Sequence, residues 1–412
     1  MIHKTHKKII FLLYTLSLCL HNFIIAPPKK LPECTTFCAP KGLTNCGNSC
    51  YMNATIQALY NLEPLKKLIM PQEQQKNYLT GSPSAALITV FEIIQGSIKD
   101  PEVKVIPESV PNAFYNGIID PLIIKKMGDD PKNPDNLRKQ QDAQELLNIL
   151  LEHLTGKAEN GTKDITKEAK NVKDIKDAFQ PKIQALFSFI TETITTCKKD
   201  NATPEIKSKL EHAEILSLAI PEDAVTLNDC LKHYTEEEKL ETNLATCTGT
   251  GATSYIQRKL QQPLPDIIIV QLKLFSYDIS GGHKIMREIA IPDPCDFGLY
   301  TNQPDKAARY TLNSVIVQHG DTLSGGHYVA YAQSNNAWYL CNDSGITKER
   351  PLFLTDTSWQ ARDNGRPYIL FYQRLPEKEI VTNVMQATEV VIFNHALEQL
   401  NNDLVALALG IH

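Results

Sequence analysis

Apolar residues recur at helical spacing in three segments of the first half of the chain. The first segment begins at Cys50, the second near Pro83 and the third at Ala143. In each of them the apolar side chains fall every three or four residues, so one face of a helix can be buried. The pattern therefore predicts three helices, and the first is expected to end near Pro64.

From about Gln184 the pattern changes to alternation and short apolar runs, which are typical of strands. The alternation is clearest from Val270 to Phe275. A helical half followed by a mainly antiparallel β half indicates the α+β class, and a cleft between such halves is a natural place for a site. Strands are expected over residues 187–195, 213–220, 266–275, 310–318, 328–333, 337–342 and 367–375.

The N-terminal segment differs from this pattern. Three lysines precede an apolar run over residues 9–20, which is the layout of an export signal. Residues 1–26 are therefore expected to be an export signal. The alternatives are a short membrane anchor, a lipoprotein-type site at Cys19, and a buried helix of the fold.

The remaining segments divide by composition. Residues 27–40 contain prolines and are interpreted as a linker. Residues 119–138 are rich in Pro, Asp and Lys and predict an exposed loop, and residues 156–176 carry many charges and predict a solvated segment. Residues 376–412 return to helical periodicity and are expected to form a helical tail. The rest, residues 41–375, would then be one folded domain.

Composition narrows the class of protein. The chain has 412 residues, a net charge of −5, 42% hydrophobic and 22% charged residues, as in ordinary globular proteins. Nucleic acid is excluded as a partner, because binding it requires a basic face. Ten cysteines are too sparse for a disulfide scaffold, and they form no clean Cys-x-x-Cys pair.

Cys50 is the first candidate for chemistry. It follows a loop of glycines and small polar residues and opens the first predicted helix. Ser49 or Asn48 is expected to cap that helix. The positive end of the helix dipole favours a thiolate at Cys50. A buried structural cysteine on a capped helix is the alternative, and spacing alone does not separate the two.

His327 is the candidate base for such a nucleophile. It follows Gly325 and Gly326, which form a tight turn, and it begins a predicted strand. The next strand ends at Asn342 and Asp343, and side chains on adjacent antiparallel strands approach to about 5 Å. Either residue could therefore orient the His327 ring. His319 and His283 are competitors, but neither has both features.

Two further polar positions have a structural and a chemical interpretation. Asn45, in the same loop as Cys50, could donate its amide to an oxyanion, or it could simply stabilise a turn. Asp142 and Glu145 precede an apolar run, as in a helix-capping box. Their spacing alone favours the cap.

Three motifs together resemble the ubiquitin-specific proteases, which are papain-like cysteine proteases that remove ubiquitin from proteins. Residues 42–53 resemble the Cys box of that family, residues 141–145 its second motif, and residues 326–344 its His box. Three motifs in the right order are more specific than any one of them. The resemblance extends from Lys41 to Arg374, so residues 41–375 are expected to be the catalytic domain.

The resemblance implies a hand-like fold of thumb, palm and fingers, with a helical half facing an antiparallel β half. It implies that Cys50 is the nucleophile, His327 the base and Asn342 the orienting residue, with Asp343 sharing or replacing that last role. It also implies that Asn45 stabilises the oxyanion. Contacts with the C-terminal tail of ubiquitin are then expected from Gln141, Asp142, Gly325, Gly326 and Tyr328.

The implied activity is thiol-dependent hydrolysis of the bond after the C-terminal glycine of ubiquitin, with ubiquitin and ubiquitinated proteins as partners. A protease for a ubiquitin-like modifier and a catalytically silent ubiquitin-binding module are the alternatives. Membrane contact is expected only through residues 9–26. The protein is expected to be exported, as an effector acting in a host cytosol, or else membrane-anchored.

The chain departs from the family pattern in its cysteines. Many members hold a structural zinc with two Cys-x-x-Cys pairs, whereas Cys197 and Cys247 here stand alone. Two thiols make a poor tetrahedral site, so neither zinc nor another cofactor is expected. Leu274 and Leu146 replace the family's usual Arg and Phe without touching the proposed catalytic residues.

Overall fold

The computed structural model describes residues 39–70, 83–98, 103–106, 140–156, 180–241, 247–249, 251–278, 281–320, 325–354 and 364–376. The predicted export signal, the loop over residues 119–138 and the tail beyond residue 376 lie outside the described residues. So do residues 27–38 of the predicted linker and all but the first residue of the segment 156–176. Among the helices of the described residues, none is both long and apolar enough to span a bilayer.

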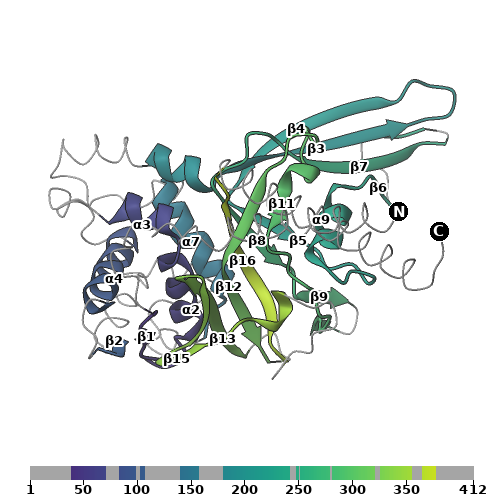
Figure 1. Ribbon diagram of the computed structural model, residues 1–412. Coiled ribbons are helices and arrows are strands. Elements are labelled where there is room, and N and C mark those ends of the chain that lie inside the picture. The colour runs from purple at the N-terminus through teal and green to yellow at the C-terminus, as the bar shows by residue number, and fades with distance from the viewer. Residues whose placement is uncertain are drawn as a thin grey trace, which may run out of the picture. The chain divides into compact units, whose positions relative to one another are not determined.

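Four helices come from the first half of the chain (Figure 1): the three predicted ones and a short additional helix, α3. The central one is α2, whose residues are all buried. It ends earlier than expected, because the chain turns at Asn61 and a separate short helix begins with Pro64 in its first turn. The helices are α2 (Cys50–Tyr60), α3 (Glu63–Ile69), α4 (Pro83–Ile98) and α7 (Ala143–Thr155).

The second half builds one eight-stranded sheet, here called the palm sheet. Its strand order is β15-β14-β13-β12-β16-β8-β5, and β11 pairs with β12. All pairs are antiparallel except β5 with β8. Helix α2 packs against β13. The strands are β5 (Ile215–Leu218), β8 (Ile267–Leu272), β11 (Cys295–Asp296), β12 (Arg309–His319), β13 (His327–Ser334), β14 (Ala337–Asn342), β15 (Gly345–Lys348) and β16 (Arg366–Arg374).

A second, four-stranded sheet forms the fingers, with the order β4-β3-β7-β6. Its long ribbons extend away from α2, α3 and α4 in Figure 1. Only β3 was predicted. The others escaped prediction because β4 is exposed on both faces and β7 carries polar residues among its apolar ones. The strands are β3 (Phe189–Lys198), β4 (Glu205–Ala213), β6 (Glu238–Lys239) and β7 (Thr253–Leu260).

Smaller elements complete the described residues. The single strand expected over residues 266–275 is wrong, because the chain leaves β8 at Leu272 and starts the β9–β10 hairpin at Phe275. Helix α9, closed by a Thr226–Asp229 capping box, was not predicted. These elements are β1 (Gly42–Leu43), β2 (Val105–Ile106), α9 (Leu227–Thr235), β9 (Phe275–Asp278), β10 (Gly281–Lys284), η3 (Phe297–Tyr300) and η4 (Leu352–Leu354).

The apolar core joins helices α2, α3, α4 and α7, here called the thumb helices, to the palm sheet, and it continues to α9 and η3. Phe297 packs edge-to-face on Tyr310 and Tyr372, with ring centroids 5.3 and 5.2 Å apart. The α+β layout expected from the sequence is confirmed. The core holds α2 rigidly against the palm strand that begins with His327, and this packing fixes the relation between the two halves of the candidate site.

Candidate active site

The loop before Cys50 is held by its own polar side chains. The Asn45 Oδ1 atom accepts hydrogen bonds from the backbone N–H groups of Gly47 (2.9 Å) and Ser49 (3.2 Å). Gly47 and Asn48 both adopt positive φ, at 94° and 52°. The expectation that Ser49 or Asn48 caps α2 is wrong, because Ser49 makes no side-chain cap and its hydroxyl accepts from the N–H of Cys46 instead.

Cys50, His327 and Asn342 come together across the seam between helix and sheet. Cys50 is the first residue of α2 and is 4% exposed. Its thiol is close enough to His327, the first residue of β13, to raise the pKa of that ring. The His327 Nε2 atom lies 2.7 Å from the Asn342 Oδ1 atom at the end of β14. Of the two candidate orienting residues, Asn342 is the one that contacts the ring.

The environment of His327 favours its charged form. The hydrogen bond with Cys50 is the main cause that raises the pKa of His327 to about 9, and the Asn342 contact and the Asp343 charge add to the rise, while burial opposes it. At neutral pH the ring is therefore an imidazolium beside the thiol. This is the partner that a nucleophilic thiolate requires.

Asp343 does not contact the His327 ring but faces the Cys50 loop. Its carboxylate accepts from the side-chain amides of Asn53 (2.8 Å) and Asn45 (2.9 Å). Its backbone carbonyl accepts from the N–H of Leu43 at 2.8 Å. Asp343 thus fastens the loop and α2 to the turn after β14, and it orients the Asn45 amide.

Gln140 is a site residue that the sequence analysis missed. Its Nε2 atom donates to the Gly326 carbonyl at 2.6 Å and lies 3.7 Å from the Cys50 sulfur. Its position directly before the second motif was the available signal. Gln141, which the motif singled out, is the next residue and is half-buried.

Asp142 caps helix α7, as the spacing of its motif predicts. Its Oδ1 atom accepts from the N–H groups of Gln144 (2.8 Å) and Glu145 (3.2 Å), which caps α7. Its carboxylate also accepts from the hydroxyls of Tyr328 and Tyr368, each at 3.0 Å. Burial, together with the Asp142 charge, raises the pKa of both phenols. Asp142 and Tyr328 are therefore hydrogen-bonded to each other beside the start of β13.

Gly325 and Gly326 lie where the turn meets β13. A Cβ on Gly326 would fall 2.3 Å from the His319 carbonyl oxygen, so only glycine allows this close approach. The His319 ring is 6.4 Å from the His327 ring, on the opposite strand. His283 lies in β10, in the β9–β10 hairpin.

Cys230 and Cys341 are also buried cysteines. Burial raises the pKa of Cys230 and Cys341 to about 12, which disfavours their thiolates. Cys197 and Cys247 form a disulfide, which the sequence analysis did not foresee. Throughout the described ranges, no group of three or more His, Cys, Asp or Glu side chains could hold a metal ion.

Comparison with known proteins agrees with this geometry. The family model of ubiquitin carboxyl-terminal hydrolase matches residues 41–372. Ubiquitin carboxyl-terminal hydrolase 24 of Arabidopsis thaliana is 25% identical over 384 residues, which is 85% of this chain and 67% of that protein. Ubiquitin carboxyl-terminal hydrolase 3 of Homo sapiens is 27% identical over 394 residues, which is 83% of this chain and 69% of that protein.

Solved structures show the same fold. The SAGA Ubp8/Sgf11/Sus1/Sgf73 DUB module bound to ubiquitin aldehyde matches with a TM-score of 0.58 at 19% identity, over 82% of this chain and 70% of that one. A structure of this module bound to monoubiquitin matches with a TM-score of 0.60 at 18% identity, over 89% and 76% of the two chains. The papain-like fold is thereby confirmed, and the chain belongs to the ubiquitin carboxyl-terminal hydrolase family, as a ubiquitin-specific protease.

Proposed function

We propose that this protein is a thiol-dependent deubiquitinase in which Cys50 attacks the carbonyl carbon of the C-terminal glycine of ubiquitin. The contact between Cys50 and His327, with Asn342 on the far side of the ring, is the observation that supports it most strongly. A thiolate beside an imidazolium is nucleophilic at neutral pH. Membership of the family supplies the substrate class.

The reaction would proceed by acyl transfer. As the thiolate adds to the carbonyl, the oxyanion receives hydrogen bonds from the N–H of Cys50 and from the Asn45 amide. The His327 imidazolium donates a proton to the leaving lysine amine, and the amine departs. Neutral His327 then takes a proton from water, which attacks the thioester and releases ubiquitin.

The tail of ubiquitin would approach between the two halves of the site. Gly325 and Gly326 offer a passage without side chains to the C-terminal glycines of ubiquitin, next to Gln141. Asp142 and Tyr328, which are hydrogen-bonded to each other, would form the wall beside that passage. Placement of Asp142 at the α7 N-cap gives this wall a fixed position.

A reactive ubiquitin with a C-terminal propargylamide tests the proposal. We expect a covalent adduct with the wild type and none with Cys50→Ala. Adducts only with probes built from a ubiquitin-like modifier would favour the alternative protease. If the wild type binds ubiquitin but forms no adduct with any probe, the chain is a silent binding module.

We also propose that residues 1–26 direct export, because three lysines followed by an apolar run are typical of such signals. A host-directed effector and a membrane-anchored enzyme are the two outcomes considered. Fractionation of cells that express the protein with and without residues 1–26 separates them: export with cleavage supports the first, and membrane retention supports the second. An unprocessed, soluble product would contradict both.

A further inference from the structure

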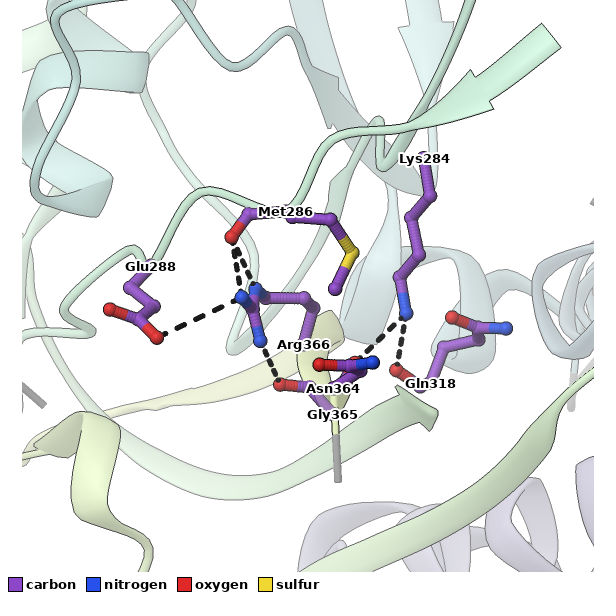
Figure 2. A network of polar contacts seen from close by, with 7 residues as sticks. All are labelled: Lys284, Met286, Glu288, Gln318, Asn364, Gly365 and Arg366. Atoms are coloured by element: carbon purple, nitrogen blue, oxygen red, sulfur yellow. Dashed lines mark hydrogen bonds and ion pairs between the residues drawn. The ribbon is translucent and has the colours of Figure 1, made fainter. Parts of the chain in front are cut away.

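Lys284, at the end of β10, is a buried cation that donates to backbone carbonyls. Its side chain is on the inside of the protein, with the residue only 7% exposed. The Nζ atom donates to the carbonyl oxygens of Gln318 (2.9 Å), Gly320 (2.7 Å) and Asn364 (3.2 Å). Figure 2 shows the ammonium pointing at the first and last of these oxygens. The ammonium thus joins carbonyls from two segments that are far apart in the sequence, residues 318–320 and Asn364.

These carbonyls lie at one end of the turn that leads to the catalytic histidine. Gln318 and Gly320 flank His319, the last residue of β12. Gly320 has a φ of +96°, and a Cβ there would lie 3.1 Å from the Cα atom of Gly326. Gly320 and Gly326 therefore lie against each other, with no room for a side chain between them.

Gly326 connects this anchor to the nucleophile. Its carbonyl accepts from Gln140, and the same Gln140 amide lies 3.7 Å from the Cys50 sulfur. The residue after Gly326 is His327, whose ring contacts Cys50. A continuous series of contacts therefore runs from Lys284 to both members of the reacting pair.

A buried ammonium is costly unless its donors are satisfied, so its position indicates what the fold needs to hold. Lys284 belongs to β10. Its acceptors are Gln318 in β12, Gly320 directly after β12, and Asn364 before β16. The ammonium thereby fixes β10 to the end of β12. Without it, the carbonyl oxygens that face it would repel one another, and residues 318–320 would shift.

Arg366 offers a matched comparison in the same view. It is 6% exposed and donates to the carbonyls of Met286 and Gly365, with Glu288 at 3.7 Å (Figure 2). It therefore joins β16 to the chain after β10. Its backbone pairs with Gln318 in the β12–β16 ladder, but these side-chain contacts are not to Gly320 or Gly326. The two buried cations have similar burial and a similar type of acceptor, and they differ in what they anchor.

We propose that Lys284 is a positioning residue of the deubiquitinase: its ammonium fixes Gly320 and, through it, Gly326 and His327 relative to Cys50. This inference rests on the proposed function for its substrate. It assigns to Lys284 a part in the reaction although the side chain touches neither the substrate nor the thiol.

The test compares Lys284→Met with Arg366→Met on a ubiquitin substrate carrying a fluorogenic C-terminal amide, at a temperature at which both variants remain folded. We expect kcat to fall roughly 10- to 100-fold in Lys284→Met, because small displacements of reacting groups have effects of this size. In Arg366→Met we expect kcat within about threefold of the wild type, even if its melting temperature falls as much as that of Lys284→Met. We also expect the alkaline limb of the pH profile to move to lower pH only in Lys284→Met.

Equal kcat values and equal pH profiles for the two variants would overturn the inference. If Lys284→Met does not fold, Lys284→Arg takes its place, because a planar guanidinium keeps the charge but cannot reproduce the three-pronged contact. A lowered kcat at an unchanged melting temperature then supports the inference, and an unchanged kcat overturns it.

The two proposals fail in distinguishable ways. If the wild type does not react with any ubiquitin probe, the proposed function fails. The rate at which iodoacetamide alkylates Cys50 still reports on the Lys284 contact, since it requires no ubiquitin. A slower rate in Lys284→Met than in Arg366→Met supports the anchor, and equal rates contradict it.

Discussion

Strands β16 and β4 are both nine residues long, yet they have opposite environments. In β16, at the centre of the palm sheet, seven successive residues are buried. In β4, at the edge of the fingers sheet, eight successive residues are exposed, including Ile206 at 65% and Leu210 at 60%. One strand is held by packing on both faces, and the other mainly by its pairing with β3.

This difference separates the part of the molecule that fixes chemistry from the part that offers surface. All the polar contacts of the candidate site arise from thumb helices, the palm sheet and the loops next to them. The fingers contribute the long exposed strand β4. They also contain the disulfide of Cys197, which lies in the neighbouring strand β3. Rigid packing is therefore concentrated where atoms must be positioned for reaction.

The largest effect is expected at the base. His327→Gln removes the imidazolium that pairs with Cys50, and we expect kcat to fall by up to about 10⁴-fold, or about 5.5 kcal/mol. His327 is half-buried at the start of its strand, so the melting temperature should change little. His319→Gln, the histidine opposite in β12, is the control. An equal loss in both variants would contradict the assignment of His327.

The next effect compares the two strands directly. Phe371→Ala in β16 removes a fully buried ring and is expected to lower the free energy of unfolding by about 3–5 kcal/mol. Leu210→Ala in β4 removes an exposed side chain, and we expect a change within about 0.5 kcal/mol. Chemical denaturation of both variants measures the difference. Similar losses would show that β4 is covered in solution.

A smaller loss is expected at the helix caps. Asp142→Ala removes the cap of α7 and leaves two buried phenols without their acceptor, so we expect a loss of about 2–4 kcal/mol. Asp229→Ala removes the capping partner of Thr226 at the start of α9, next to the fingers. We expect the free energy of unfolding to fall by about 1 kcal/mol. Equal losses, measured by denaturation, would mean that the phenols find other partners.

The same contrast explains what could be read from the sequence. Most palm strands were predicted because their apolar runs are long, and the bounds of β14 were predicted to the residue. The short palm strands β11 and β15 were not predicted. The fingers strand β4 was missed because lysines, glutamates and exposed apolar residues follow each other without a buried face. Sequence patterns record burial, so a strand that is stabilised by pairing alone leaves a weak signal.

Within the site, the sequence predicted which residues meet but not how their hydrogen bonds are shared. Cys50, His327 and Asn342 were found from motif and strand adjacency. Two hydrogen bonds depend on tertiary geometry: the Cys46 N–H donates to the Ser49 hydroxyl, and the Gln140 amide donates to the Cys50 sulfur. The Cys197–Cys247 pairing likewise joins residues 50 positions apart, which no local pattern can indicate.

The pH dependence of kcat/KM for the fluorogenic ubiquitin substrate tests the central claim, that Cys50 and His327 react as a charged pair. The pKa of His327 is raised to about 9, so the imidazolium persists below that pH and is lost above it. We therefore predict that activity is retained at pH 8 and falls with an apparent pKa near 9 in the wild type. In Asn342→Ala, which loses a contact that raises this pKa, the fall should move to lower pH. Activity that instead rises through about pH 6.5, the ordinary pKa of histidine, with no fall near pH 9, would contradict the account.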